Sequence, residues 1–163
     1  MLSVLPVIFS LQPAPAPSWG ESPAEYRERA ELIDRAIVDA TEGRRKLALA
    51  VVVVFHGESR FSLLVQSGEH RGDGGRALCM GQAHRGGLSE AEWLSLIGTD
   101  YDSIRRCALV TANRLIAAYR YCHSYPGAFV LYGTGRTCDA GETRWAGLFR
   151  DRGAKWERFN HAD

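Results

Sequence analysis

The chain has 163 residues, of which 45% are apolar and 24% are charged, and its formal net charge is +1. These values are typical of one globular domain that is long enough to bury a complete core. The near-zero net charge argues against an overall electrostatic attraction to nucleic acids or to a membrane surface, although it does not exclude a local basic patch.

Residues 1–20 consist of a short apolar run, MLSVLPVIFSL, and a Pro-rich linker. The run is too short to cross a bilayer, so no transmembrane helix is predicted. It is either the hydrophobic region of a signal peptide, with small residues around Ala14 and Ala16, or a buried arm or docking peptide. No Lys or Arg precedes the run, which argues against a signal peptide. We place the main domain at residues 21–163.

The first predicted helix follows Ser22, which is expected to cap it. Pro23 then takes the first helical position, and Glu25 completes a capping box with the serine. Apolar residues follow at helical spacing, and the helix is expected to end near Gly43.

The next segment is apolar without interruption from Leu47 to Phe55, LALAVVVVF. Four consecutive valines favour a strand by propensity, and periodicity alone does not separate a buried strand from a buried helix. The leucines and alanines at 47–50 favour a helix. We therefore predict a buried helix that ends close to Glu58.

Residues 67–88 are rich in glycine and are predicted to form a loop with special backbone geometry. Gly-rich loops can bind phosphate groups, but neither GxGxxG nor GxxxxGK[ST] occurs here. A nucleotide site is therefore not expected.

Helices are predicted to resume after this loop, so the chain as a whole is expected to be mainly α. Ser89 and Glu92 form a second capping box. A turn at residues 124–127 leads into a short apolar helix, and a last helix carries Trp145 and Trp156, whose spacing indicates core positions rather than sugar stacking. The longest helix, from Asp102, is defined by the stripe Ile104, Ala108, Thr111, Leu115, Ala118 and Cys122.

Four cysteines are present, Cys79, Cys107, Cys122 and Cys138, and none forms a CxxC pair, which argues against a zinc site. Cys107 and Cys122 lie on one predicted helix, roughly 22 Å apart, too far for a disulfide. Two connectivities remain, Cys79–Cys107 with Cys122–Cys138, or Cys79–Cys122 with Cys107–Cys138. Four reduced, buried cysteines are the alternative, whereas disulfides would imply an oxidising compartment.

Glu58 is the first candidate for chemistry, because it ends the apolar helix. A carboxyl group in a dry setting holds its proton more readily and can act as a general acid and then as a general base. The alternative is a structural glutamate paired with Arg60 or another basic residue.

Asp73, fifteen residues later, is a second carboxylate. Paired carboxylates suit glycoside hydrolysis, although Asp73 taken alone is more typical of a turn. The spacing of His56, His70 and His84 fits no metal motif, and Ser59 lacks the surroundings of a nucleophilic serine.

Three segments together resemble a known family. GESRF after an apolar helix resembles the E-S-x-F motif of soluble lytic transglycosylases and goose-type lysozymes. GDGGRALCMGQ resembles the Gly-rich segment of that family, which ends in glutamine, and AFVLYGTG resembles its Y-N-x-G segment. The sequence departs from the family where Cys79 replaces a glycine, Gly81 replaces a methionine and Gly133 replaces an asparagine.

The resemblance implies a lysozyme-like single domain in which the Gly-rich loop carries part of the active-site cleft. It implies that Glu58 is the catalytic acid and base, and that Ser59 helps to hold the N-acetyl group of the sugar. Gln82 would contact the glycan, Tyr132 would orient the acetamido group or the catalytic glutamate, and Asp73 would position water. No cofactor or metal is implied.

The expected function is cleavage of the β-1,4 bond between N-acetylmuramic acid and N-acetylglucosamine in peptidoglycan, as a lytic transglycosylase with 1,6-anhydro products. A hydrolytic goose-type lysozyme is the first alternative, and a non-catalytic wall-binding or structural subunit is the second. The expected partner is peptidoglycan in an extracytoplasmic location. Residues 1–20 would serve as an anchor or docking strand in a secretion, conjugation or phage assembly.

Overall fold

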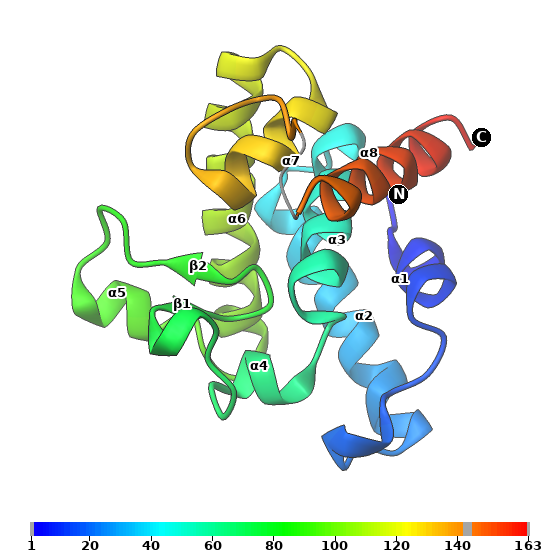
Figure 1. Ribbon diagram of the computed structural model, residues 1–163. Helices are drawn as coiled ribbons and strands as arrows, with labels where there is room; N and C mark the ends of the chain where they lie inside the picture. The colour runs from blue at the N-terminus through cyan, green and yellow to red at the C-terminus, as the bar shows by residue number, and fades with distance from the viewer. Residues whose placement is uncertain (1, 142–144, 163) are drawn as a thin grey trace.

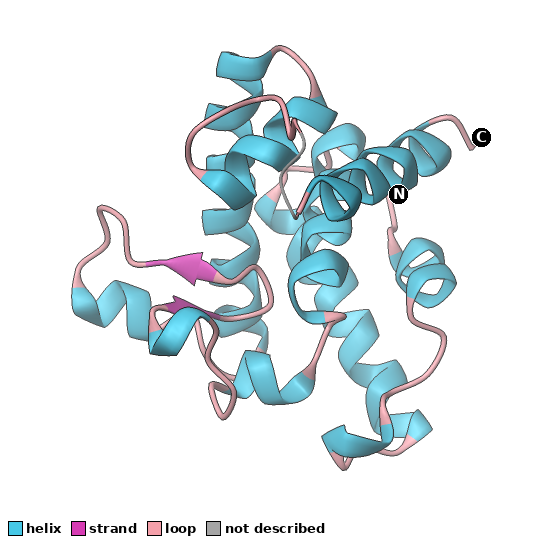
Figure 2. Cartoon of the chain, in the orientation of Figure 1, coloured by secondary structure: helices cyan, strands magenta, loops and turns pink. Residues whose placement is uncertain are grey.

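The computed structural model describes residues 2–141 and 145–162 and is mainly helical, as predicted (Figures 1 and 2). Helix α3 (Arg45–Ser59) lies at the centre, and α2 (Pro23–Ala40), α6 (Tyr101–Cys122) and α8 (Ala146–Asn160) pack against it. The other elements are α1 (Leu5–Leu11), η1 (Pro17–Trp19), α4 (Leu63–Ser67), η2 (Asp73–Gly75), β1 (Ala77–Leu78), β2 (Ala83–His84), α5 (Glu90–Leu94) and α7 (Tyr125–Thr134).

Helix α2 begins with the predicted capping box. The Ser22 hydroxyl accepts a hydrogen bond from the Glu25 backbone N–H, and the Glu25 carboxylate accepts one from the Ser22 N–H at 2.8 Å. A cap of this kind stabilises a helix by about 1 kcal/mol. The apolar face of α2, including Ile33 and Ile37, is fully buried.

The buried helix predicted from the apolar run is confirmed. Every residue from Leu47 to Phe55 is at most 3% exposed, because α3 has neighbours on all sides and is apolar all round. The helix ends at Ser59, and Arg60 and Phe61 then adopt left-handed φ values of 53° and 60° that reverse the chain.

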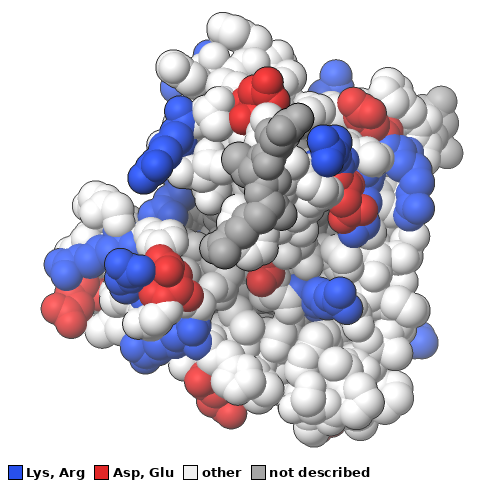
Figure 3. Space-filling model, in the orientation of Figure 1, with Lys and Arg blue, Asp and Glu red and all other residues white. Residues whose placement is uncertain are grey.

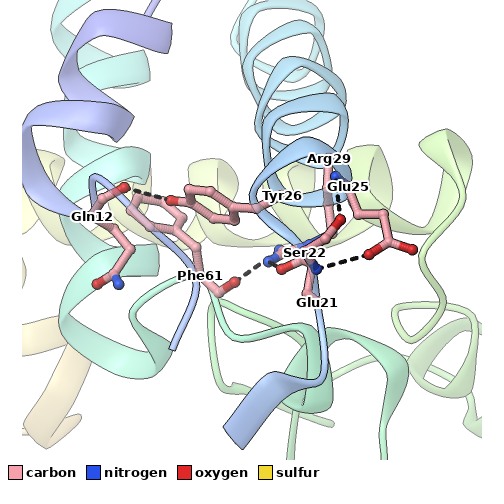
Figure 4. A network of polar contacts seen from close by, with 7 residues as sticks. All are labelled: Gln12, Glu21, Ser22, Glu25, Tyr26, Arg29 and Phe61. Atoms are coloured by element: carbon pink, nitrogen blue, oxygen red, sulfur yellow. Dashed lines mark hydrogen bonds and ion pairs between the residues drawn. The ribbon is translucent and has the colours of Figure 1, made fainter. Parts of the chain in front are cut away.

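A buried polar network holds this chain reversal (Figure 4). The Arg29 guanidinium of α2 donates to the Phe61 carbonyl at 2.8 Å and to both carboxylate oxygens of Glu21 at 2.6 and 2.7 Å. The Tyr26 hydroxyl donates to the Gln12 carbonyl at 2.7 Å. Since the Arg29 and Glu21 side chains are only 6% and 4% exposed, the network firmly joins the N-terminal segment to the end of α3.

The N-terminal segment belongs to the core. Val4 and Ile8 are fully buried in the same hydrophobic cluster as Ile33, and Asp34 of α2 accepts a hydrogen bond from the Val4 N–H. An anchoring or docking role for residues 1–20 would require these apolar side chains to leave the core. In the part of the chain that the structure describes, no helix has the length and apolarity needed to cross a membrane.

The Gly-rich segment is not wholly a loop, because β1 and β2 form a short antiparallel hairpin within it. The expected special backbone geometry is present. Asp73, Cys79 and Gln82 have left-handed φ values of 49°, 58° and 48°, which non-glycine residues seldom adopt. Local conformation is therefore costly here, and other contacts have to hold the hairpin in place.

Two disulfides join Cys79 to Cys107 and Cys122 to Cys138. They resolve the two connectivities left open by the sequence. The first bridge attaches the hairpin to α6, and the second attaches the end of α6 to the segment after α7. Each closes a loop whose entropy in the unfolded chain is thereby reduced.

Among the later helices, one start agrees with prediction and one differs; the short helices α1 and α4 were not predicted, and α8 begins just after Trp145, which was predicted to lie in it. Ser89 and Glu92 form the expected capping box of α5. The predicted turn at residues 124–127 is instead the first turn of α7, because the Ser124 hydroxyl caps the helix by accepting from the Gly127 N–H. Pro126 is compatible with this position, since the first turn does not need its N–H.

Candidate active site

A cleft of about 440 Å³ lies between the end of α3, the hairpin, α7 and α8. Four of the five site residues predicted from the sequence line it, although they come from three distant segments. The lining residues are Glu58, Asp73, Ala77, Gln82, His84, Tyr132, Gly133, Trp145, Leu148, Phe149 and Arg152.

Charges of both signs meet in the cleft. Glu58 and Asp73 bring carboxylates, whereas Arg152 brings a guanidinium and His84 an imidazole. The surrounding face also intersperses acidic and basic side chains without a continuous field of one sign (Figure 3). A polar but nearly neutral ligand suits this arrangement better than a polyanion.

Glu58 is not in the dry, unpaired setting that its sequence position suggested. Its side chain is 22% exposed, and its Oε1 accepts a hydrogen bond from Arg152 Nη1 at 2.8 Å. The partner is thus Arg152 of α8 and not the neighbouring Arg60. Oε2 has no hydrogen-bond partner among the described residues and remains available to a ligand in the cleft.

Arg152 is 1% exposed, and two neighbouring residues accommodate its buried side chain, one by leaving space and one by contact. The first is Gly57 of α3, where an added Cβ would lie 2.3 Å from Arg152 Nε. The second is Phe149, whose ring lies 5.6 Å from the guanidinium carbon in a cation–π contact. A side chain at position 57 would therefore displace Arg152 from Glu58.

Asp73 lies at the start of η2 on the opposite wall of the cleft and is about half exposed. It pairs with Arg76 at 3.1 Å, and its other oxygen is 3.7 Å from His84 Nε2. Exposed pairs of this kind are weak, so a ligand or a water molecule can compete for the carboxylate.

Gln82 occupies the turn between β1 and β2. Its backbone N–H and its side-chain amide both donate to the Cys79 carbonyl, at 2.9 and 3.2 Å. The side chain lies against Gly72, where an added Cβ would be 1.6 Å from Gln82 Oε1. The orientation of Gln82 therefore depends on the absence of a side chain at position 72 and on the disulfide at Cys79.

Tyr132 of α7 connects the two walls, because its hydroxyl donates to the Gly81 carbonyl at 2.6 Å. Burial raises the pKa of Tyr132 to about 12, and the nearby Glu58 charge acts in the same direction. Tyr132 therefore stays protonated and able to donate at neutral pH. At Gly81 a Cβ would lie 2.2 Å from the Thr111 hydroxyl, which explains why no larger residue stands there.

Gly133 also has a steric explanation. A Cβ at this position would lie 2.4 Å from a ring carbon of Phe149, so the packing of α8 against α7 requires glycine. Gly133, which stands where the resembled family has asparagine, is therefore needed for Phe149 of α8 to pack beside the cleft.

Ser59 is the predicted site residue that the structure does not bring to the cleft. Its hydroxyl donates to the Phe55 carbonyl one helical turn earlier, at 2.9 Å. This local bond satisfies the hydroxyl within α3. Contact between Ser59 and a sugar in the cleft would require the side chain to rotate.

Sequence reasoning missed the contribution of α8. Trp145 was assigned to the core, but it is 50% exposed and lines the cleft, whereas Trp156 is buried as predicted. Arg152 was not considered at all, since nothing in its sequence neighbourhood marks it.

No cluster of three or more His, Cys, Asp or Glu side chains suited to a metal ion occurs within residues 2–141 and 145–162. Of the three histidines considered from the sequence, His84 lines the cleft, His70 is exposed on the Gly-rich segment, and His56 lies at the end of α3.

His56 is a site of pH sensitivity in the fold. Burial lowers its pKa to about 4, and the charges of Lys155 and Arg60 act in the same direction. An unfolded histidine has a pKa of about 6.5. The stability that the neutral imidazole contributes is complete above about pH 6.5, falls as pH drops from 6.5 to 4, and does not change further below.

We expect His56→Gln to flatten the dependence of the free energy of unfolding on pH between 6.5 and 4. The difference between a pKa of about 6.5 and one of about 4 corresponds to about 3 kcal/mol, and solvent screening of this partly exposed side chain reduces it to about 1 to 2 kcal/mol. Urea unfolding at several pH values measures it. Parallel pH profiles of the wild type and the variant would contradict this assignment.

Comparisons with protein-family models, with curated proteins and with solved structures found no match to this chain.

Proposed function

We propose that the chain is a peptidoglycan-cleaving glycosidase with a lysozyme-like fold, acting as a lytic transglycosylase. One observation carries this proposal. Three segments that resemble the motifs of that family in sequence supply Glu58, Asp73, Gln82 and Tyr132 to the walls of one cleft.

In this mechanism Glu58 is the acid and then the base. The acid step requires a proton on Oε2, the oxygen without a hydrogen-bond partner among the described residues, and this proton passes to the glycosidic oxygen while Oε1 continues to accept from Arg152. The resulting carboxylate is stabilised by the arginine, so Arg152 orients the group and stabilises its charged form. The acetamido group of the substrate stabilises the developing cation, and Glu58 then takes the proton of the C6 hydroxyl to form the 1,6-anhydro ring.

The other cleft residues are assigned to binding. Gln82 and the protonated Tyr132 offer polar groups beside the reacting sugar. Trp145 adds an exposed aromatic surface of the kind that sugars stack on. Asp73, on the wall opposite Glu58, is suited to positioning a water molecule, which would make the hydrolytic lysozyme reaction available.

The proposed location is extracytoplasmic. Two disulfides in a chain of this size are typical of proteins that fold in an oxidising compartment. Peptidoglycan is found in the same surroundings, so the location agrees with the proposed substrate.

The test is incubation of the purified chain with purified peptidoglycan, followed by mass analysis of the released muropeptides. We expect products that end in 1,6-anhydro-N-acetylmuramic acid and are lighter by one water than hydrolytic products. Reducing ends throughout would instead assign the lysozyme reaction and a water-positioning role for Asp73. Absence of both products would overturn the glycosidase proposal.

The ion pair between Glu58 and Arg152 favours a second candidate, a non-catalytic wall-binding subunit. A buried arginine requires a counter-ion, and a structural glutamate would serve that need without any chemistry. This candidate predicts that the chain sediments with purified cell walls but releases no muropeptides from them.

A further inference from the structure

A second hollow, of about 570 Å³, lies between α6 and α7 and adjoins the cleft. Tyr132 contributes to the walls of both cavities, so the two are neighbours across one side chain. Helices α6 and α7 lie side by side in Figures 1 and 2 and pack directly on each other. We call this cavity the α6–α7 hollow.

The shape of the hollow follows from residue sizes on one face of α6. Arg114, Ala117, Ala118 and Tyr121 recur at helical spacing and therefore share a face. The two alanines form a low floor between the long side chains of Arg114 and Tyr121. On α7 the opposite wall includes Leu131, so the interior is largely apolar.

Among the residues that the structure describes, the charged groups that line the hollow are two arginines, Arg114 and Arg136, and none of these lining residues is acidic. One nitrogen of the Arg114 guanidinium donates to the His84 carbonyl, which directs this side chain along the border with the cleft. The Arg136 guanidinium has no hydrogen bond or ion pair within the described residues. A guanidinium without a partner, such as that of Arg136, above an apolar floor is suited to a carboxylate, which it binds in a forked geometry.

The exposed wall adds an aromatic surface, since Tyr121 is 70% exposed. Large exposed aromatic residues are common in sites that bind peptides or sugars, because they offer contact area at small entropic cost. A ligand with carboxylates and small apolar side chains would fill this hollow. An acidic, alanine-containing peptide has this chemistry, whereas a phosphate would use only the arginines.

We propose that the α6–α7 hollow binds the acidic peptide of a peptide-substituted glycan strand whose sugars occupy the cleft. The inference rests on the proposed function and adds to it a preference for strands that carry their peptides. Because Tyr132 lines both cavities, a peptide that leaves the cleft past Tyr132 would enter the hollow, where Arg136 offers a partner for its carboxylate.

The first test compares cleavage of peptide-bearing glycan strands with cleavage of strands from which an amidase has removed the peptides. We expect the wild type to cleave the peptide-bearing strands about tenfold more efficiently, as for one charge-assisted hydrogen bond. Arg136→Ala should remove this preference while the rate on stripped strands stays unchanged. Arg105→Ala removes an exposed arginine from the same α6 helix, outside the hollow, and should keep the preference.

Equal cleavage of both strands by the wild type, or a preference that persists in Arg136→Ala, would overturn the inference and leave the proposed function intact. Thermal unfolding of each variant separates loss of binding from loss of fold.

The second test does not depend on catalysis. Binding of the tripeptide Ala-Glu-Ala with free carboxylates, and of its carboxamide form, is measured by nuclear magnetic resonance. We expect only the carboxylate form to shift signals of the hollow, and Arg136→Ala to weaken binding about tenfold. Equal binding of both forms, binding of inorganic phosphate with the same affinity, or no binding would overturn the inference. If the wild type cleaves no glycan, this test still decides whether the hollow is a peptide site.

Discussion

Glu58→Gln is expected to reduce glycan cleavage by about 10²- to 10⁴-fold, as for loss of a general acid and base. Glutamine has the same shape and can accept the hydrogen bond of Arg152, but its amide cannot deliver a proton to the glycosidic oxygen or take one afterwards. The measurement is the initial rate of muropeptide release from purified peptidoglycan. Binding to the same material should persist, because the change leaves the cleft walls in place.

The same substitution should lower the free energy of unfolding by about 1 to 3 kcal/mol, because Arg152 is buried and loses its counter-charge. Asp151→Asn is the matched control, since it is also a carboxylate-to-amide change on a pair with a basic residue. The Asp151 pair with Lys155 is exposed, so we expect less than about 0.5 kcal/mol and full activity. Wild-type rates in Glu58→Gln would show that the glutamate is only structural.

Removal of the disulfide by Cys79→Ala with Cys107→Ala should lower the free energy of unfolding by about 3 to 4 kcal/mol. The sequence separation of 28 residues sets this magnitude in the chain-entropy model. We also expect glycan cleavage to fall at temperatures where the variant is still folded. The reason is that the Cys79 carbonyl holds Gln82, in a hairpin whose residues Cys79 and Gln82 have left-handed φ values. Urea unfolding and muropeptide release measure the two effects.

The other bridge provides the control. Cys122→Ala with Cys138→Ala opens a loop with a sequence separation of 16 and should cost a similar amount, about 3 kcal/mol. It does not touch the hairpin, so activity below the unfolding transition should be nearly retained. Equal losses of activity in the two double variants would show that the first bridge acts through global stability alone.

Local sequence was sufficient for the longer helices, although it did not predict the short helices α1 and α4. The capping boxes at Ser22 and Ser89 act within one turn, so their residues predict the helix starts directly. The helix containing Glu58 was also predictable, because nine apolar residues have to be buried. The hairpin was missed, because its strands have two residues each, too few for an alternating pattern to be recognised.

The cleft was only partly predictable. Motifs placed Glu58, Gln82 and Tyr132 in one list of candidates, and the structure brings them to one cleft. Ser59 shows the limit of this reasoning, because a serine near a helix end can satisfy its hydroxyl within its own helix. Arg152 is the converse case, a cleft residue that the sequence did not predict, because no local pattern marks an arginine that will be buried.

Short-range hydrogen bonds, burial and helix geometry are enough to predict the helical class, the helix that carries Glu58 and the exclusion of a Cys107–Cys122 bridge. Packing between distant segments sets the pairing of Glu58 with Arg152, the position of Trp145 at the cleft and the pairing of the cysteines. These features require segments up to 94 residues apart to meet. Their meeting depends on how α8 and the hairpin pack around α3, and no local pattern encodes that packing.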